Sequence, residues 1–308
     1  PSPDMVSVQH LARIGALDFQ ERWRRGDYSG ATDRAIEVLG LGRRLASSRH
    51  ETVIVPLVGT VISANQHGVI DREAGTLTGV PAPELQRFLS GLNRIDAYEA
   101  PVEEVTVLAE RDVWLRIADQ LQTKGLPEKD AAYDWAVWLI HGNLNTHSRN
   151  LYDGLAAKIA ARDFEGADAM VDRLSLPFPQ VMLSMLFHPG DTVSIMLLSI
   201  QSTTLGATEK LLAAEARFDA LRVRLASELY RRRHGAPPPS LEALVPAYMA
   251  AVPADPFKPD RPLRYAKGRL WSVGWDGVDQ QGRVATDLKA LAKGRRKGKR
   301  PPGDLVLL

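Results

Sequence analysis

The sequence predicts a mostly α-helical protein of the α+β class, with an all-helical N-terminal domain followed by a long helix and a small antiparallel sheet. Three observations lead to this prediction. Hydrophobic residues recur at helical spacing through most of residues 1–203. The longest such stripe follows at residues 208–233, and short β-like segments separated by turn residues come after it. We therefore expect three parts: an all-helical domain at 1–203, a long helix with a small sheet at 204–287, and a basic tail at 288–308 that ends in a strand-like segment.

The N-terminal helices are predicted from a series of amphipathic segments. Residues 32–46 carry apolar side chains near 3.6-residue spacing, with Asp33 in the first turn and two arginines in the last, where these charges favour the helix dipole. Similar patterns predict helices over 51–64, 83–92, 105–121, 129–140, 151–161 and 164–174. We expect the last two to form a hairpin turned at Arg162 and Asp163.

The C-terminal third begins with the most regular pattern in the chain. Apolar residues in steps of three and four over 208–233 predict one helix of about 35–40 Å at 1.5 Å per residue. The prolines at 237–239 end this helix, and Ser240 is a candidate cap for a short helix over 241–249. Beyond it, two β-like segments are separated by Gly268, which predicts a hairpin; they are 263–266 and 270–273.

The composition excludes several classes of protein and site. Of the 308 residues, 44% are hydrophobic and 25% are charged, which is typical of globular domains. The chain has no cysteine, so disulfides, iron–sulfur clusters and cysteine-ligated zinc are excluded. The longest apolar runs, Val53–Ile62 and Thr192–Ile200, are far shorter than the roughly 20 residues that cross a bilayer, so we expect no transmembrane helix in this chain.

The sequence carries no signature of an enzyme class. No Gly-x-Ser-x-Gly, Walker A or dinucleotide motif occurs, and none of the seven histidines forms the i, i+4 pair of a zinc protease helix. One acidic cluster leads into the helix predicted at 105–121; its members are Glu103, Glu104, Glu110 and Asp112. Such carboxylates serve either as acid and base or as partners of the helix dipole. We expect a protein that is not an enzyme, with a carboxylate-dependent hydrolase as an alternative.

Motifs in the C-terminal third carry a resemblance to a known family. After the long helix come Ser-Leu-Glu-Ala-Leu-Val at 240–245, Val-Pro-Ala-Asp-Pro-Phe at 252–257, Pro-Leu-Arg-Tyr at 262–265 and Trp-Ser-Val-Gly-Trp-Asp-Gly at 271–277. Over about residues 208–287 the chain thus resembles the periplasmic half of the major pseudopilin of type II secretion. Together with the helical segments before it, this module is similar to a family of uncharacterised bacterial envelope proteins.

The resemblance implies a function and a location. It implies a non-enzymatic structural or interaction subunit of a bacterial cell-envelope assembly, in the periplasm, with other envelope proteins as partners. Members of the family usually begin with one membrane helix, so the resemblance also implies an anchor that this chain does not display. About 207 residues precede the pseudopilin-like helix here, which argues against ordinary incorporation into a pseudopilus through that helix.

The resemblance also implies a calcium site. Pseudopilins bind calcium in the loop after the final strand, and on that basis Asp276, Asp279 and Asp287 are the candidate ligands. The loop does not match an EF-hand, because the alternating ligands and the final Glu are missing. Asp276-Gly277 is also a common pair in tight turns, so a plain turn without metal is the alternative.

The basic tail is the second candidate site. Six of eight consecutive residues are basic: Lys293, Arg295, Arg296, Lys297, Lys299 and Arg300. This run predicts a polyanion-binding segment for anionic lipid headgroups or acidic partner proteins. We do not expect nucleic acid as the partner, because no aromatic residues interleave to stack on bases. The alternative is a solvated, flexible loop.

Overall fold

The structure of the protein is a computed structural model. It describes residues 5–48, 53–73, 75, 77–95, 100–124, 149–174, 189–283 and 303–308. These residues are mostly helical and include two small antiparallel sheets, which confirms the predicted α+β class. The chain forms two compact units, one of residues 1–48, 55–99 and 210–308 and one of residues 49–54 and 100–209. The predicted division at residues 203 and 287 stays a prediction.

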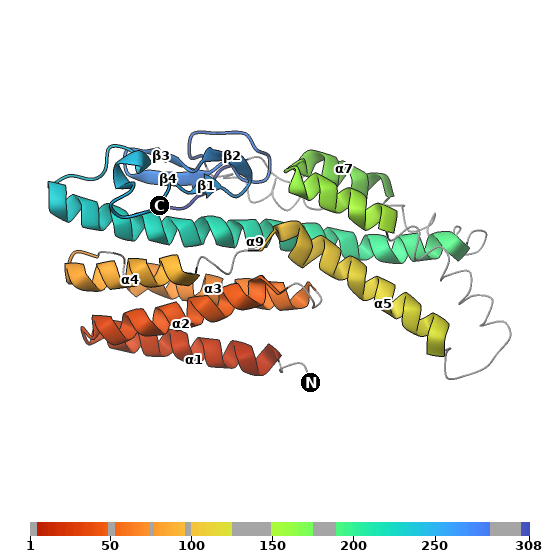
Figure 1. Ribbon diagram of the computed structural model, residues 1–308, viewed down its shortest axis with the longest axis horizontal. Helices are drawn as coiled ribbons and strands as arrows, with labels where there is room; N and C mark the ends of the chain where they lie inside the picture. The colour runs from red at the N-terminus through yellow and green to blue at the C-terminus, as the bar shows by residue number, and fades with distance from the viewer. Residues whose placement is uncertain are drawn as a thin grey trace. The chain divides into compact units, whose positions relative to one another are not determined.

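The first unit contains four N-terminal helices, the C-terminal half of the longest described helix, and all the strands that the described residues form. Its helices are α1 (Met5–Arg24), α2 (Tyr28–Ala46), α3 (Ile54–Glu73), α4 (Ala82–Ile95) and α9 (Pro189–His234). In this unit α9 lies between the N-terminal helices on one side and the strands on the other (Figure 1). One hydrophobic core joins both sides, and its fully buried members include Phe19, Leu39, Phe88, Phe218 and Leu244.

Two glycines bring α2 and α3 into close contact. A Cβ atom added at Gly59 would lie 2.4 Å from the backbone nitrogen of Ala46 and 2.4 Å from the carbonyl oxygen of Gly42. A Cβ atom added at Gly42 would in turn lie 2.9 Å from the carbonyl oxygen of Gly59. The two backbones therefore pack so closely that only glycine, which has no Cβ atom, fits at these positions.

The sheets lie after α9 and are built from short strands. The first sheet pairs β1 (Ala254–Asp255) with β2 (Lys258–Pro262), and the second has the order β3 (Arg264–Ala266), β4 (Arg269–Ser272), β5 (Leu305–Val306). Lys267 and Gly268 connect β3 to β4 with φ angles of 52° and 78°, as a two-residue type I′ turn requires. The hairpin predicted around Gly268 and the strand-like C-terminal segment are both confirmed.

Two helical predictions in this region differ from the structure. The helix expected over 241–249 is a single 3₁₀ turn, η3 (Leu241–Leu244), and the side chain of Ser240 makes no capping hydrogen bond. Pro246 has no N–H with which to continue the turn. The long helix begins at Pro189 rather than near Thr208. Periodicity does not indicate this extension, because the sequence over 192–200 is apolar at most positions.

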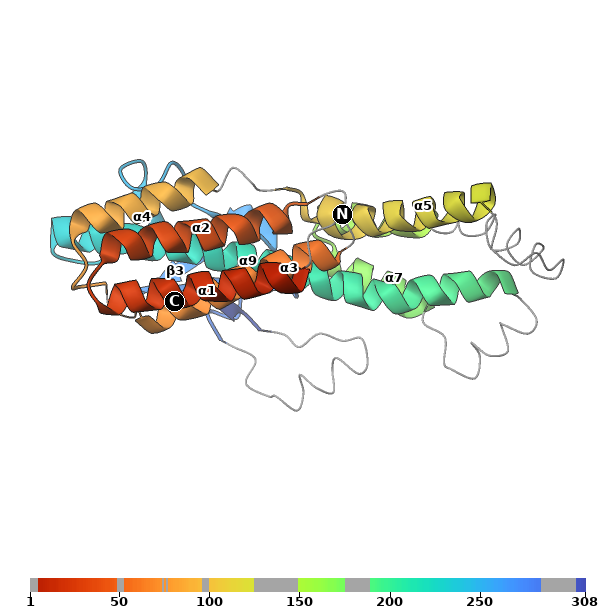
Figure 2. The ribbon, with the colours of Figure 1, turned by 90° about the horizontal axis from the view of Figure 1, so that it is seen from below.

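The second unit contains the elements between Ala100 and Glu209. They are the π-helix η2 (Glu104–Leu108), α5 (Ala109–Lys124), a helix over 149–160, α7 (Phe164–Leu174) and the first half of α9. The predicted helical hairpin is confirmed: Arg162 has a φ of 56°, and Asp163 Oδ1 accepts a hydrogen bond of 2.9 Å from Gly166 N. The helix predicted over 129–140 lies outside the described residues. Figure 2 shows α5 and α7 in a second view.

No helix in the described part of the chain has both the length and the apolar character that a membrane span requires.

Candidate functional site

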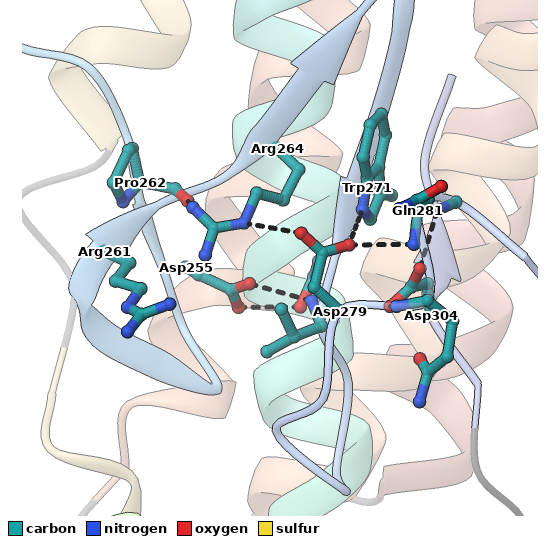
Figure 3. Close-up of polar contacts among 12 residues, drawn as sticks. Asp255, Arg261, Pro262, Arg264, Trp271, Asp279, Gln281 and Asp304 are labelled. Carbon is teal, nitrogen blue, oxygen red and sulfur yellow. Dashed lines mark hydrogen bonds and ion pairs between the residues drawn. The ribbon is translucent and has the colours of Figure 1, made fainter.

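The loop after β4 holds two of the three predicted calcium ligands. Figure 3 shows Asp279 between side chains from two strands and the backbone of its own loop. Its Oδ1 accepts hydrogen bonds from Trp271 Nε1 at 3.0 Å and Gln281 N at 2.9 Å, and its Oδ2 lies 3.2 Å from Arg264 Nε. Burial raises the pKa of Asp279, but these hydrogen bonds and Arg264 outweigh it and hold the pKa below its usual value.

Asp276 is exposed and also accepts N–H groups. Its Oδ1 accepts from Val278 N at 3.1 Å, and its Oδ2 accepts from Gln280 Nε2 at 2.8 Å and Gly303 N at 3.2 Å. The bond to Val278 is the Asx turn typical of Asp-Gly sequences. A Ca²⁺ ion at this loop would have to replace several of these hydrogen bonds.

A buried aspartate that the sequence does not single out completes the arrangement. Asp304 is 4% exposed, and its two oxygens accept from Gln280 N at 3.1 Å and Gly282 N at 2.6 Å. These bonds hold the C-terminal segment, which contains β5, against the loop that precedes it. The carboxylates of this region therefore stabilise the loop between β4 and β5 by accepting hydrogen bonds from its N–H groups.

The predicted metal site is not assembled by the described residues. Among them, no three His, Asp or Glu side chains are grouped so that they could hold a metal ion. Asp287 lies outside the described residues, and so does the whole predicted polyanion site: Lys293, Arg295, Arg296, Lys297, Lys299 and Arg300. Calcium binding and polyanion binding stay predictions.

The acidic cluster of the hydrolase alternative has basic or backbone partners in the second unit. Glu110 is 7% exposed, and its Oε1 accepts a hydrogen bond of 2.8 Å from Val53 N. Glu103 lies 3.7 Å from an arginine nitrogen of Arg162, and Asp112 lies 2.9 Å from one of Arg111. The contacts of Glu110 and Glu103 join segments that are distant in the sequence, whereas the Arg111–Asp112 contact lies within α5.

A row of exposed aliphatic side chains on α1 is a feature that the sequence analysis does not identify. Leu11, Ile14 and Leu17 are 66%, 62% and 63% exposed, and we call them the α1 face. Val6 is 58% exposed but lies five residues before Leu11, outside this row. The opposite side of α1 buries mainly small residues and two aromatic ones: Ala12, Gly15, Ala16, Phe19 and Trp23. The large aliphatic residues thus point outward on a helix whose inner surface packs closely.

A small polar cavity lies between α3, α9 and the C-terminal segment of the first unit. Its volume is about 150 Å³, and its lining includes His67, Asp71, Arg217, Arg224 and residues 306–308. His67 is 6% exposed, and its Nε2 has no hydrogen-bond partner. Burial, followed by the charges of Arg217 and Arg43, lowers the pKa of His67 to about 4, so the imidazole is neutral at pH 7. We call this cavity the His67 pocket.

Comparisons with protein-family models, with curated proteins and with solved structures gave no match. The resemblance to the major pseudopilin therefore depends on the sequence motifs alone and stays a prediction.

Proposed function

We propose that this protein is a non-enzymatic interaction subunit of a bacterial cell-envelope assembly and that it binds a partner protein through the α1 face. The observation that carries the proposal is the exposure of the row formed by Leu11, Ile14 and Leu17, each more than 60% exposed. Single exposed aliphatic residues are normal on protein surfaces. A contiguous apolar row instead marks a surface that another molecule covers.

The geometry of the α1 face favours a helix as the partner element. Residues three apart on a helix are neighbours on one side, so Leu11, Ile14 and Leu17 form a continuous ridge. Such a ridge packs into the groove of a second helix. Complete burial of one Leu or Ile contributes about 1.5–3 kcal/mol. Since each of the three residues is already about one-third buried, together they offer on the order of 3–6 kcal/mol before the costs of association.

The envelope location is supported by the resemblance of the C-terminal motifs. In the structure those motifs form, in order, a one-turn helix, two hairpins and an Asp-Gly turn after β4. Each of them is a turn or cap that a pseudopilin-like module needs after its long helix. The proposed periplasmic location and the proposed envelope partners follow from this likeness.

The proposal is tested with a double variant of the full chain, Leu11→Gln with Leu17→Gln. Gln has a helix propensity close to that of Leu, so α1 stays folded. Val278→Gln is the matched control, because Val278 is 57% exposed but does not belong to an apolar row. After mild cross-linking in the native cells, we expect envelope proteins to co-purify with the wild type and the control but not with the double variant.

Two results would contradict the proposal. One is an equal yield of the same partners with the double variant, which would place the contact elsewhere. The other is a cross-link that joins only two copies of this chain, which would make the α1 face a self-association surface.

A further inference from the structure

The lining of the His67 pocket includes one arginine that makes no ion pair with the described residues. Arg224 Nη1 lies 3.0 Å from Asp71 Oδ1, and Arg43 makes two contacts of 2.5 and 3.2 Å with Glu215. Arg217, in contrast, has no ion-pair or hydrogen-bond partner among the residues that the structure describes. The side chain of Arg217 is exposed, so its guanidinium is accessible to a ligand from solvent.

The pocket also contains an unsatisfied buried polar group. A buried nitrogen without a hydrogen-bond partner is costly, and such groups are rare in folded proteins. The Nε2 atom of His67 is such a nitrogen, and the His67 side chain lines the cavity. Phe218 packs edge-on against the imidazole, with ring centroids 6.5 Å apart, and so limits its rotation. The neutral ring offers one N–H donor and one acceptor.

The size and the walls of the pocket restrict what it holds. A volume of about 150 Å³ is below the roughly 300–1,000 Å³ of sites for larger ligands, so the pocket suits a small anion and not a nucleotide. Ala220 and Leu221 form an apolar wall with the C-terminal residues. Leu308 is fixed there by hydrogen bonds of 3.2 and 3.4 Å with the backbone of Leu270.

We infer that the His67 pocket binds a small oxyanion, a phosphate or a short carboxylate, with Arg217 as its main ligand and His67 as a second hydrogen-bonding partner. Arginine suits this role because its planar guanidinium bonds to two oxygens of such an anion at once. Arg224 closes the site from one side while its own charge is balanced by Asp71. The anion would neutralise Arg217 and order the contact between α3, α9 and β5.

Calorimetric titration of the full chain with inorganic phosphate, and separately with acetate, tests the inference at low ionic strength and pH 7. We expect saturable binding of at least one anion at one site per chain, weakened at least tenfold in Arg217→Gln. Arg217→Lys keeps the charge but loses the planar fork, so we expect an intermediate affinity. Tighter binding of phosphate would indicate a phosphorylated ligand, and tighter binding of acetate a carboxylic acid.

Arg233→Gln is the matched control. Arg233 is an exposed arginine of the same helix, about 24 Å further along α9 at 1.5 Å per residue. Its removal changes the net charge equally and leaves the pocket intact. An equal loss of binding in Arg217→Gln and Arg233→Gln would show only a general charge effect, and the inference would be wrong. Absence of saturable binding of both anions to the folded wild type would also overturn it.

Discussion

Gly59→Ala should destabilise the protein although alanine favours helices. In a helix interior, replacing Gly by Ala gains about 1 kcal/mol. At Gly59 the added methyl group would lie 2.4 Å from two backbone atoms, Ala46 N and Gly42 O, and 2.9 Å from Leu45 Cβ. Backbone atoms cannot rotate away, so α2 and α3 must separate. Such overpacking costs about 1–3 kcal/mol, and two backbone clashes place it at the upper end. The expected net loss is about 2 kcal/mol.

Gly68→Ala provides the matched control within α3. The nearest atom to a Cβ at Gly68 is Arg72 Nη1 at 3.7 Å, an ordinary contact with the end of a flexible side chain. The same substitution should therefore stabilise the protein, by up to about 1 kcal/mol. Urea unfolding followed by circular dichroism measures both changes as shifts of the midpoint at constant slope. The reasoning is refuted if Gly59→Ala is as stable as the wild type or if both variants shift in the same direction.

Three further predictions concern buried polar groups. The pKa of His67 is about 4 in the folded protein and 6.5 ordinarily, so the unfolded chain binds a proton first as the pH falls. The free energy of unfolding should therefore decrease by about 3 kcal/mol between about pH 6.5 and 4. Urea midpoints measured across this range should show the decrease in the wild type and not in His67→Gln. Glu215→Gln removes the carboxylate that pairs with Arg43, whose side chain is only 9% exposed. Thermal unfolding should then show a free energy of unfolding lower by about 2–4 kcal/mol. An unchanged free energy would mean that solvent already screens the pair. Asp255 Oδ1 accepts from Phe257 N and, at 2.6 Å, from Ser272 Oγ, and its Oδ2 accepts from Val273 N. Asp255→Asn replaces one of these oxygens with an NH2 group that cannot accept, and should cost about 1–3 kcal/mol in the same assay; an unchanged midpoint would show that these hydrogen bonds do not contribute to stability.

The pH dependence of Asp255 has the opposite sign to that of His67. Burial raises the pKa of this carboxyl despite its three hydrogen bonds. The folded state therefore prefers the protonated form, and the contribution of Asp255 to stability increases as the pH falls from its folded pKa towards its unfolded one. The gap between wild type and Asp255→Asn should widen on acidification, and a gap that narrows would contradict the assigned direction.

The elements that the sequence predicts correctly are those that depend on residues close together in the chain. The β3–β4 hairpin depends on a two-residue turn, and Lys267-Gly268 has the left-handed φ angles that this turn demands. The hairpin of helices around Arg162 and Asp163 is similar, because one residue in the left-handed region and one capping carboxylate define it. These elements could be predicted from the residues themselves.

The elements that were missed depend on contacts distant in sequence. The spacing of apolar residues does not single out α1, because its inner surface is made largely of small residues such as Ala12 and Ala16 while Leu11 and Leu17 face outward. The His67 pocket joins a helix near residue 67 to one near 217 and to the C-terminal strand. No spacing rule connects positions about 150 residues apart, so neither the pocket nor the role of Asp304 could be foreseen.

The central claim, that the α1 face binds a partner protein, is tested most directly by photo-cross-linking in the native cells. A photoreactive amino acid is placed at Leu17, in the apolar row, or at Val278, an isolated exposed residue. We expect a discrete cross-link to one envelope protein from position 17 and none from position 278. No cross-link from position 17, or the same products from both positions, would contradict it.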